Sequence, residues 1–280
     1  MREIHCDTIT DAVERLCIEA ATVLPPALGI LLECAAESEE SPAGIAALED
    51  IVENFKYAAM SGTPICQDTG MAVVFADVGQ DAHITGGSFE ECINEGVRRG
   101  YEKGLLRSSV AADPLRRVNT GDNTPCVLHV RLTSGDRIVL HVAPKGFGSE
   151  NMSAMRMFIP TDSIGTIEDF IVDTVSKAGA NPCPPVVLGV GLGGTVEQCA
   201  ILAKRALIRP MDTRNSDAFY AGMERRVLEK INRLGIGPQG FGGRYTAVAV
   251  NIDAYPVHIA GLPCVVNMGC HATRHAHTVL

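Results

Sequence analysis

The sequence contains no tryptophan, and aromatic residues make up only 5% of its 280 positions. Basic residues are also scarce, since 24 Lys and Arg stand against 33 Asp and Glu and give a formal net charge of −9. An acidic protein repels phosphate backbones and anionic lipids, so we expect neither nucleic acid nor a membrane as a partner. No apolar run approaches the ~20 residues that span a bilayer, and the first ten residues lack the charged and apolar regions of a signal peptide. The sequence therefore predicts a cytoplasmic protein.

Cysteine is abundant, but no C-x-x-C pair is present among the ten, which gives no support for a zinc ribbon or a thioredoxin-like site. Ten cysteines in a chain of this length are too sparse for a disulfide scaffold, and the cytoplasm keeps thiols reduced. We expect most of them, including Cys17 and Cys199 on apolar helix faces, to be small buried residues. The remaining cysteines have to be judged by their neighbours.

The first half of the chain predicts helices and an antiparallel sheet. Apolar spacing predicts two helices within 11–36, broken at Pro25-Pro26, and a helix over 43–60. Ser88 with Glu91 forms a capping box that opens a helix to about Lys103. A strand is expected at 71–76, and alternating apolar residues at 126–132 and 138–142, on either side of a turn, predict a β-hairpin.

The second half alternates helices and strands. Helices are expected near 167–178, up to about 207, and over 216–234, with buried strands at 186–190 and 246–252. This rhythm is typical of α/β units. The sequence therefore predicts a mixed α/β fold in one region over 1–280, with two subdomains joined near 150–165.

A glycine-rich turn follows the first of these strands. Gly189, Gly191 and Gly194 satisfy G-x-G-x-x-G between a strand and a helix, which is formally a dinucleotide-binding pattern. The acidic residue expected about 20 positions later at the end of a second strand is missing, because Asp212 follows Pro210 with no strand before it. A dinucleotide-dependent oxidoreductase stays as one alternative.

Two polar stretches of the first half are embedded in apolar sequence. Residues 64–70, Pro-Ile-Cys-Gln-Asp-Thr-Gly, place a thiol, an amide and a carboxylate in consecutive positions of a loop. A structural turn uses Asp, Thr and Gly but gains nothing from Cys66. Residues 144–151, Pro-Lys-Gly-Phe-Gly-Ser-Glu-Asn, combine Lys145 with glycines whose N–H groups can hold an anion. An ordinary turn with Ser149 as a helix cap is the alternative.

Two more such stretches lie in the second half. Cys183 stands between Pro182 and Pro184, which limits backbone freedom and suits a thiolate held towards a metal. Residues 255–275 carry His258, Cys270 and a His271/His275 pair at i, i+4. That pair lacks the Glu of a zinc protease motif, and His277 is expected to be solvated.

Three isolated cysteines in Gly- and Pro-rich loops, Cys66, Cys183 and Cys270, can converge in space. Three thiolates leave one iron of a 4Fe–4S cluster without a protein ligand, and an open iron is a Lewis acid that binds a hydroxyl and a carboxylate oxygen. A redox cluster usually takes four cysteines. The pattern therefore favours chemistry at the iron over electron transfer.

These stretches together resemble one family, the class I (iron–sulfur) fumarases and the related L-tartrate dehydratases. The resemblance covers nearly the whole chain. It is carried by the motifs at 64–70, 119–125 (Asn-Thr-Gly-Asp-Asn-Thr-Pro), 145–151, 183–185, 191–195, 258–263 and 267–270.

The resemblance implies roles for individual residues. Cys66, Cys183 and Cys270 match the three cluster ligands, and Asp68 and His258 match residues that handle the proton on the leaving hydroxyl. Gln67 matches a substrate contact, Arg107 an arginine that grips a carboxylate, and Gly148 a backbone donor. Independently of the family, an acidic protein that binds a dicarboxylate needs local positive charge, which Arg107, Lys145 and the iron can supply.

Single-chain relatives continue into a region that supplies further arginines, a lysine and a threonine base, whereas this sequence ends at Leu280. The resemblance therefore implies the α subunit of an α2β2 hydro-lyase that needs a β subunit. Its implied reaction is hydration of fumarate to (S)-malate, a step of the tricarboxylic acid cycle, and the alternative is dehydration of tartrate to oxaloacetate. A non-catalytic iron–sulfur protein is a third possibility.

Overall fold

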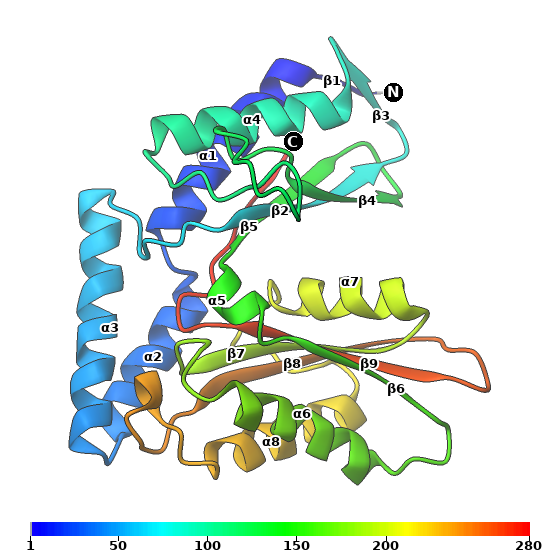
Figure 1. The fold of residues 1–280 in the computed structure, drawn as a ribbon. Coiled ribbons are helices and arrows are strands. Elements are labelled where there is room, and N and C mark those ends of the chain that lie inside the picture. The colour runs from blue at the N-terminus through cyan, green and yellow to red at the C-terminus, as the bar shows by residue number, and fades with distance from the viewer. Residues whose placement is uncertain (1) are drawn as a thin grey trace. The chain divides into compact units, whose positions relative to one another are not determined.

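The computed structural model describes residues 2–280 (Figure 1). These residues form two units, each built from segments that are not contiguous in sequence. Unit 1 comprises residues 2–25, Tyr57–Gly146 and Arg274–Leu280, and unit 2 comprises Pro26–Lys56 and Phe147–Thr273. The chain passes between the units at four points. One of them, between Gly146 and Phe147, lies near the expected join, and another coincides with the expected helix break at Pro25-Pro26. The predicted mixed α/β class is confirmed.

Unit 1 is built on a four-stranded mixed sheet in the order β10-β5-β2-β4, with a separate parallel pair, β1 (Arg2–His5) and β3 (Ala82–Thr85). Its strands are β2 (Met71–Gly79), β4 (Val127–Thr133), β5 (Ile138–Lys145) and β10 (Ala276–Val279). The predicted hairpin is wrong, because β2 lies between β4 and β5, parallel to the first and antiparallel to the second. The burial pattern explains this order: β2 is buried on both faces and takes a central place, whereas the largely exposed β4 suits an edge.

Two helices cover one face of this sheet. They are α1 (Cys6–Thr22) and α4 (Phe89–Lys103), and the Ser88 hydroxyl caps α4 by accepting the Glu91 N–H. Gly96 and Gly100 let the helices approach closely, since a Cβ at Gly96 would lie 2.6 Å from the Thr10 carbonyl oxygen. As predicted, Cys17 is fully buried in this core.

Unit 2 contains a second four-stranded sheet in the order β6-β9-β7-β8. The strands β7 (Val186–Gly193) and β8 (Ala247–Tyr255) are parallel, as α/β units require. The strands β6 (Ala154–Phe158) and β9 (Leu262–Gly269) were not predicted, and they run antiparallel to their neighbours. The second half is therefore a mixed sheet and not a purely parallel one.

Helices cover both faces of the unit 2 sheet (Figure 1). On one face α6 (Ile164–Ala178) contacts β9 and α8 (Ala218–Asn232) contacts β8, and their buried apolar residues share one core cluster with the sheet. On the other face α7 (Val196–Ala206) contacts β7 and β9. Cys199, a residue of α7, is fully buried, as predicted. The remaining helices are α2 (Pro26–Ser38), α3 (Pro42–Ser61), the short α5 (Phe147–Glu150) and a 3-10 turn at Pro238–Gly240.

One stretch, Cys6–Ser38, is long and apolar enough to span a bilayer by length and composition, with a mean hydropathy of 1.6 in its most apolar part. The sequence expectation of no such stretch is therefore wrong on this criterion alone. Non-helical residues at 23–25 divide the stretch into α1 and α2, and half of its most apolar part is buried. Core helices of soluble proteins pass the same test, so the finding is weak evidence for a membrane.

Candidate functional site

In unit 1 the loop that carries Cys66, Gln67 and Asp68 is held by buried side chains from other parts of the unit. The Tyr101 hydroxyl lies 3.0 Å from the carbonyl oxygens of both Thr69 and Gly70, and Asn123 donates from Nδ2 to the Gly70 carbonyl at 3.2 Å. Tyr101 is 2% exposed and Asn123 is fully buried. Burial raises the pKa of Tyr101, so its hydroxyl remains a donor. Hydrogen bonds from two buried side chains therefore fix the backbone at the end of this loop.

The Asp68 carboxylate is placed by its own loop and by a glycine. Its Oδ1 accepts the Gly70 N–H at 3.0 Å, and the backbone carbonyl of Asp68 accepts from the buried Arg274 guanidinium. A Cβ at Gly146 would lie 3.1 Å from Asp68 Oδ2, so this glycine leaves room for the carboxylate. A half-buried carboxylate held in this way can accept or donate a proton at a defined position.

Arg107 belongs to the same part of unit 1. Its backbone N–H donates to Thr69 Oγ1 at 2.9 Å, and the Thr69 hydroxyl donates back to the Arg107 carbonyl at 3.3 Å. The Arg107 side chain is exposed. Unit 1 therefore brings together Cys66, Gln67, Asp68 and Arg107, four of the predicted site residues.

In unit 2 the loops of Cys183 and Cys270 meet. The backbone N–H of His271, next to Cys270, donates to the Cys183 carbonyl at 3.2 Å, and His271 Nδ1 lies 3.0 Å from the same oxygen. Cys183 has a φ of +56°, a left-handed conformation that costs energy for a non-glycine residue. Strain of this kind is concentrated at functional sites.

Accessibility separates the three predicted ligand cysteines from most of the others. Cys183 is exposed, and Cys66 and Cys270 are half-buried. By contrast, burial raises the pKa of Cys199 to about 11 and of Cys126 to about 12, which keeps these thiols protonated. Cys34, on α2, is the other exposed cysteine among residues 2–280. No group of three His, Cys, Asp or Glu residues is gathered for a metal ion within 2–280; Cys183 and Cys270 belong to unit 2 and Cys66 to unit 1.

The Lys145–Asn151 motif is divided between the units. Lys145 ends β5 in unit 1, where it is largely buried and its Nζ donates to the Gly146 carbonyl at 3.2 Å. Gly148 lies exposed in α5 of unit 2, within a motif anchored by Glu150, which pairs with Lys204 and accepts from Asn267 Nδ2 at 2.9 Å. Ser149 is buried inside α5 and does not cap a helix, so that alternative is wrong.

The histidines of the last predicted stretch are dispersed. His258 is exposed in the loop between β8 and β9, where its Nδ1 accepts the Ala260 N–H at 3.2 Å. His271 belongs to unit 2 and His275 to unit 1, where burial lowers the pKa of His275 to about 4. His277 is exposed, as predicted, although it lies in β10 and stacks on His141.

The G-x-G-x-x-G pattern has a packing explanation. Gly189 and Gly191 lie inside β7, not in the turn, and a Cβ at either position would come within 2.1 Å of a carbonyl oxygen of α7. The pattern therefore permits close contact between strand and helix. Nothing in this arrangement presents the first two glycines to a pyrophosphate, which disfavours the dinucleotide alternative.

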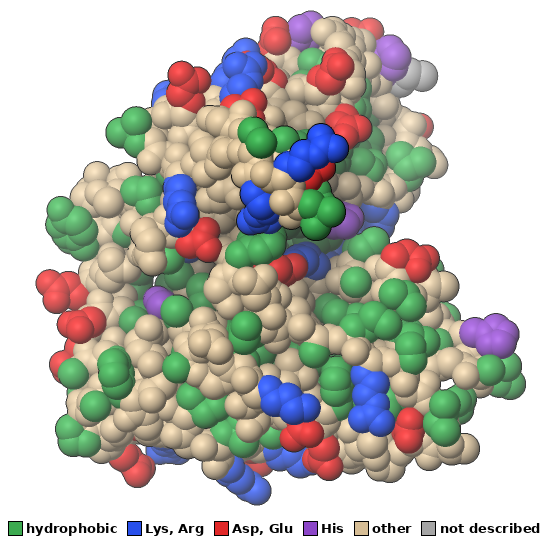
Figure 2. Space-filling view, viewed as in Figure 1, with side chains coloured by type: hydrophobic (Ala, Val, Ile, Leu, Met, Phe, Trp, Pro, Cys, Tyr) green, Lys and Arg blue, Asp and Glu red, His purple; other side chains and the backbone are tan. Residues whose placement is uncertain are grey.

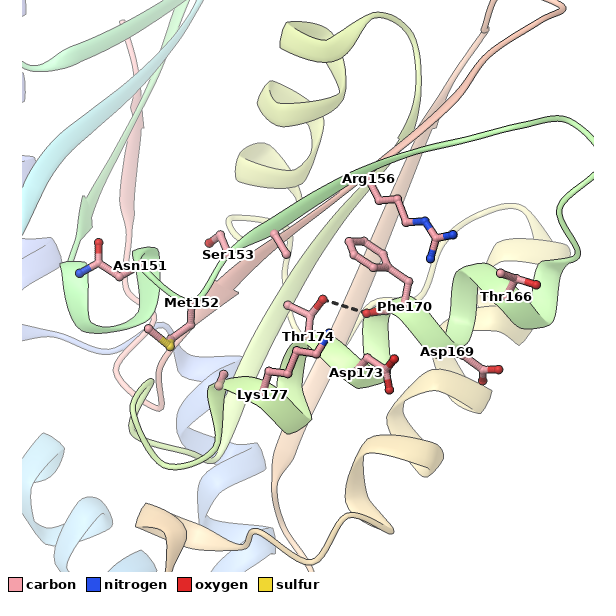
Figure 3. Close-up of a pocket in the computed structure, with 12 residues that line it drawn as sticks. Asn151, Met152, Ser153, Arg156, Thr166, Asp169, Phe170, Asp173, Thr174 and Lys177 are labelled. Carbon is pink, nitrogen blue, oxygen red and sulfur yellow. Dashed lines mark hydrogen bonds between the residues drawn. The ribbon is translucent and has the colours of Figure 1, made fainter.

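A pocket of about 520 Å³ lies in unit 2 between α6, the start of β6 and the residues after α5 (Figure 3). Arg156 and Lys177 lie among its lining residues together with Asp169 and Asp173, so charges of both signs face it. Asn151, from the end of the predicted motif, also lines it, but none of the predicted site residues does. Over the visible face of the molecule acidic and basic side chains are interspersed (Figure 2).

Sequence reasoning missed the residues that hold the site loops. Tyr101, Asn123 and Arg274 act on the Cys66 loop, and Gln239 and His271 act on the Cys183 loop. Asn123, Arg274 and His271 lie within polar stretches that the sequence did single out. Tyr101 and Gln239 carried no signal, because each contacts a loop far away in sequence.

Comparison with known proteins gives a consistent result. The sequence pattern of a family described as fumarate hydratase (Fumerase) matches residues 10–279. A protein of Methanocaldococcus jannaschii named putative L(+)-tartrate dehydratase subunit alpha is 41% identical over 274 residues, covering 96% of each chain. The L(+)-tartrate dehydratase subunit alpha of Escherichia coli K12 is 29% identical over 270 residues, covering 95% of this chain and 88% of the relative. The protein of that name in Shigella sonnei matches to the same extent.

Proposed function

The chain belongs to the fumarate hydratase (Fumerase) family, and we propose that it is the α subunit of a hydro-lyase that removes water from L(+)-tartrate. The observation that carries this choice of substrate is the 41% identity, over nearly the full length of both chains, to a protein named as a tartrate dehydratase α subunit. The more distant relatives from E. coli and Shigella carry the same name. Tartrate dehydration thus replaces fumarate hydration as the first candidate.

Cys66, Cys183 and Cys270 would hold a 4Fe–4S cluster. The chemistry of the donor set fits, because these thiols are accessible and come from loops, whereas most other cysteines are buried in apolar surroundings. When bound, such a cluster supplies a Lewis acid for a hydroxyl and a carboxylate oxygen. The backbone of the Cys66 and Cys183 loops is hydrogen-bonded to buried or half-buried side chains, which is what a rigid ligand requires.

The residues around Cys66 suit the binding of a dicarboxylate. The exposed Arg107 guanidinium can form a two-pronged contact with a carboxylate, and this orients the substrate. Gln67 Oε1 accepts from the Cys66 thiol at 3.4 Å, which places its amide beside the proposed ligand. Lys145 and the Gly148 backbone N–H are the other predicted contacts.

In the proposed reaction the bond between one carbon and its hydroxyl breaks, and the neighbouring carbon loses a proton. Asp68 and His258 are proposed to handle the proton that converts the departing hydroxyl to water. The enol that results from tartrate rearranges to oxaloacetate. The base that takes the carbon-bound proton is proposed to lie on a β subunit, because the relatives are named as α subunits. An α2β2 assembly in the cytoplasm is part of the same proposal.

Hydration of fumarate to (S)-malate is the second candidate, supported by the description of the matching family. It would use the same residues in reverse, with water added across the double bond. The two reactions differ in the second hydroxyl of tartrate, so a direct comparison of substrates separates them.

The test is to co-express the chain with its β subunit without oxygen and to measure oxaloacetate from L(+)-tartrate and (S)-malate from fumarate. We expect the higher kcat/KM with tartrate, no comparable rate from the α chain alone, and loss of activity in air. Asp68→Asn should lower kcat while cluster absorbance remains, and Asp81→Asn, at an exposed site in the same unit, serves as the control. A higher kcat/KM with fumarate, or full activity of the α chain alone, would overturn the corresponding part of the proposal.

A further inference from the structure

Cys183 adopts a backbone conformation that is unfavourable for a residue other than glycine. Its φ of +56° places it in the left-handed region, and Gln239, which lies close to it, has a φ of +52°. A non-glycine residue persists there only where its surroundings hold it. The contacts of the Cys183 loop therefore determine where its thiol lies.

Two side chains provide these contacts. His271 approaches the Cys183 carbonyl oxygen with both its backbone N–H, at 3.2 Å, and its ring Nδ1, at 3.0 Å. Gln239 donates to the next carbonyl, that of Pro184, from its backbone N–H at 2.8 Å and from Nε2 at 2.7 Å. Gln239 Nε2 also lies 3.2 Å from His271 Nδ1, so the two side chains touch each other.

This arrangement links the Cys183 and Cys270 loops through a residue that neighbours one of them. His271 follows Cys270 directly, so a hydrogen bond from its ring to the Cys183 carbonyl couples the positions of both cysteines. The backbone N–H groups of His271 and Gln239 give each of the two carbonyls one hydrogen bond. The His271 ring and the Gln239 amide each add a second, which restricts the two peptide planes further.

We propose that His271 and Gln239 are positioning residues that hold the thiols of Cys183 and Cys270 side by side, ready to bind one iron–sulfur cluster. The inference rests on the proposed function for the identity of that cluster, but the pairing of the two thiols is a property of the metal-free chain. It assigns no contact with substrate to either residue.

A groove of about 450 Å³ adjoins this pair. It is lined by His271, Gln239 and Phe241 and by small residues of α3, among them Ala43 and Ala47. A His271→Ala variant would enlarge this groove, because the ring lines it. Free imidazole can then enter the groove and replace the missing ring.

The test uses the full, metal-free chain with Cys34→Ser and Cys66→Ser, which leaves Cys183 as the exposed cysteine and Cys270 and Cys126 as the half-buried ones within 2–280. Burial raises the pKa of Cys126 to about 12, so its thiol reacts slowly. Dibromobimane, which becomes fluorescent on joining two neighbouring thiols, measures their pairing. We expect rapid cross-linking in this parent and a rate about fivefold lower in His271→Ala, which corresponds to one lost hydrogen bond.

The matched variants separate positioning from a general loss of structure. His271→Asn places an amide near the position of Nδ1 and should restore the rate, whereas His271→Gln reaches the position of Nε2 and should not. Gln239→Met keeps side-chain length but loses the amide and should also slow cross-linking, with Gln80→Met, at an exposed site, as the control. Imidazole should partly rescue His271→Ala.

Equal cross-linking rates in the parent, His271→Ala and Gln239→Met would overturn the inference, and so would a parent that does not cross-link. If the cross-linking rates are as expected but the chain takes up no iron, the pairing of the two thiols stands and the proposed cluster is rejected. Cluster absorbance of the loaded wild-type chain, recorded in parallel, distinguishes these two failures.

Discussion

Tyr101→Phe removes one buried hydroxyl beneath the loop that carries Cys66 and Asp68. A phenol has a single proton, so the two 3.0 Å distances to the Thr69 and Gly70 carbonyls describe one shared hydrogen bond, not two. The Gly70 carbonyl keeps Asn123 as a donor, but the Thr69 carbonyl loses the hydroxyl. Losing a buried hydrogen bond and leaving its acceptor unpaired costs about 2 kcal/mol.

This energy should appear as local opening of the loop. Lowering the free energy of opening by about 2 kcal/mol corresponds to roughly a 30-fold larger open population. The N–H groups of Gly70 and Arg107, which donate to Asp68 and Thr69, report the opening by hydrogen exchange. Tyr57→Phe is the control, because Tyr57 is 60% exposed and the change should stay within about 0.5 kcal/mol. Unchanged exchange at Gly70 and Arg107 in Tyr101→Phe would refute the idea that Tyr101 holds this loop.

Three further predictions concern the framework. Burial alone raises the pKa of Glu39, but hydrogen bonds from backbone N–H groups, among them those of Ser41 and Arg244, lower it overall. The ionised carboxylate therefore stabilises the fold, and this contribution is lost as pH falls below about 4.5. Glu39→Gln should lower the free energy of unfolding by about 2 to 4 kcal/mol at pH 7, measured with urea, and should weaken the loss of stability at acid pH. Gly191→Ala should lower stability by about 1 to 3 kcal/mol in the same assay, because its Cβ would meet the Cys199 carbonyl at 2.1 Å, whereas a Cβ at Gly261 meets nothing within 4 Å and Gly261→Ala is the control. Because the pKa of His275 is lowered to about 4 in the folded chain, the unfolded chain binds one more proton between pH 6.5 and about 4. The free energy of unfolding should therefore decrease as pH is lowered from 6.5 to about 4, and it should decrease less in His275→Asn.

The helices were predictable because their signals are local. The capping box at Ser88 and the apolar stripe of 43–60 each specify an element without reference to the rest of the chain, and the structure confirms both. Strand partners are different, because pairing depends on residues far away. The turn at 133–136 favoured a hairpin, but the fully buried β2 needs neighbours on both sides and separates the two strands.

The candidate site shows the same division. Cys66, Asp68 and Cys183 could be singled out from their immediate neighbours, since a thiol or carboxylate in a Gly- or Pro-rich loop stands out. Tyr101 and Gln239 could not, because a buried tyrosine on a helix and a glutamine in a turn have ordinary local explanations. Only the folded chain shows that their polar atoms face the carbonyls of the cysteine loops.

The glycines of β7 illustrate an opposite error. Gly189 and Gly191 match a phosphate-binding pattern by spacing, yet their positions are set by contact with α7. A spacing rule records which residues lack a side chain and not what approaches them. The absence of a Cβ permits close approach of a nucleotide phosphate in one fold and of a helix backbone in another.

The most direct test of the account is to measure iron and acid-labile sulfide in the chain after anaerobic reconstitution, in the wild type and in Cys66→Ser, Cys183→Ser and Cys270→Ser. Cys34→Ser is the matched control, because Cys34 is exposed but lies on a helix outside the predicted set. We expect equal amounts of iron and sulfide with a cluster chromophore in the wild type and in Cys34→Ser, and loss of the chromophore in each of the other three variants. An intact cluster in Cys66→Ser, Cys183→Ser or Cys270→Ser would contradict it.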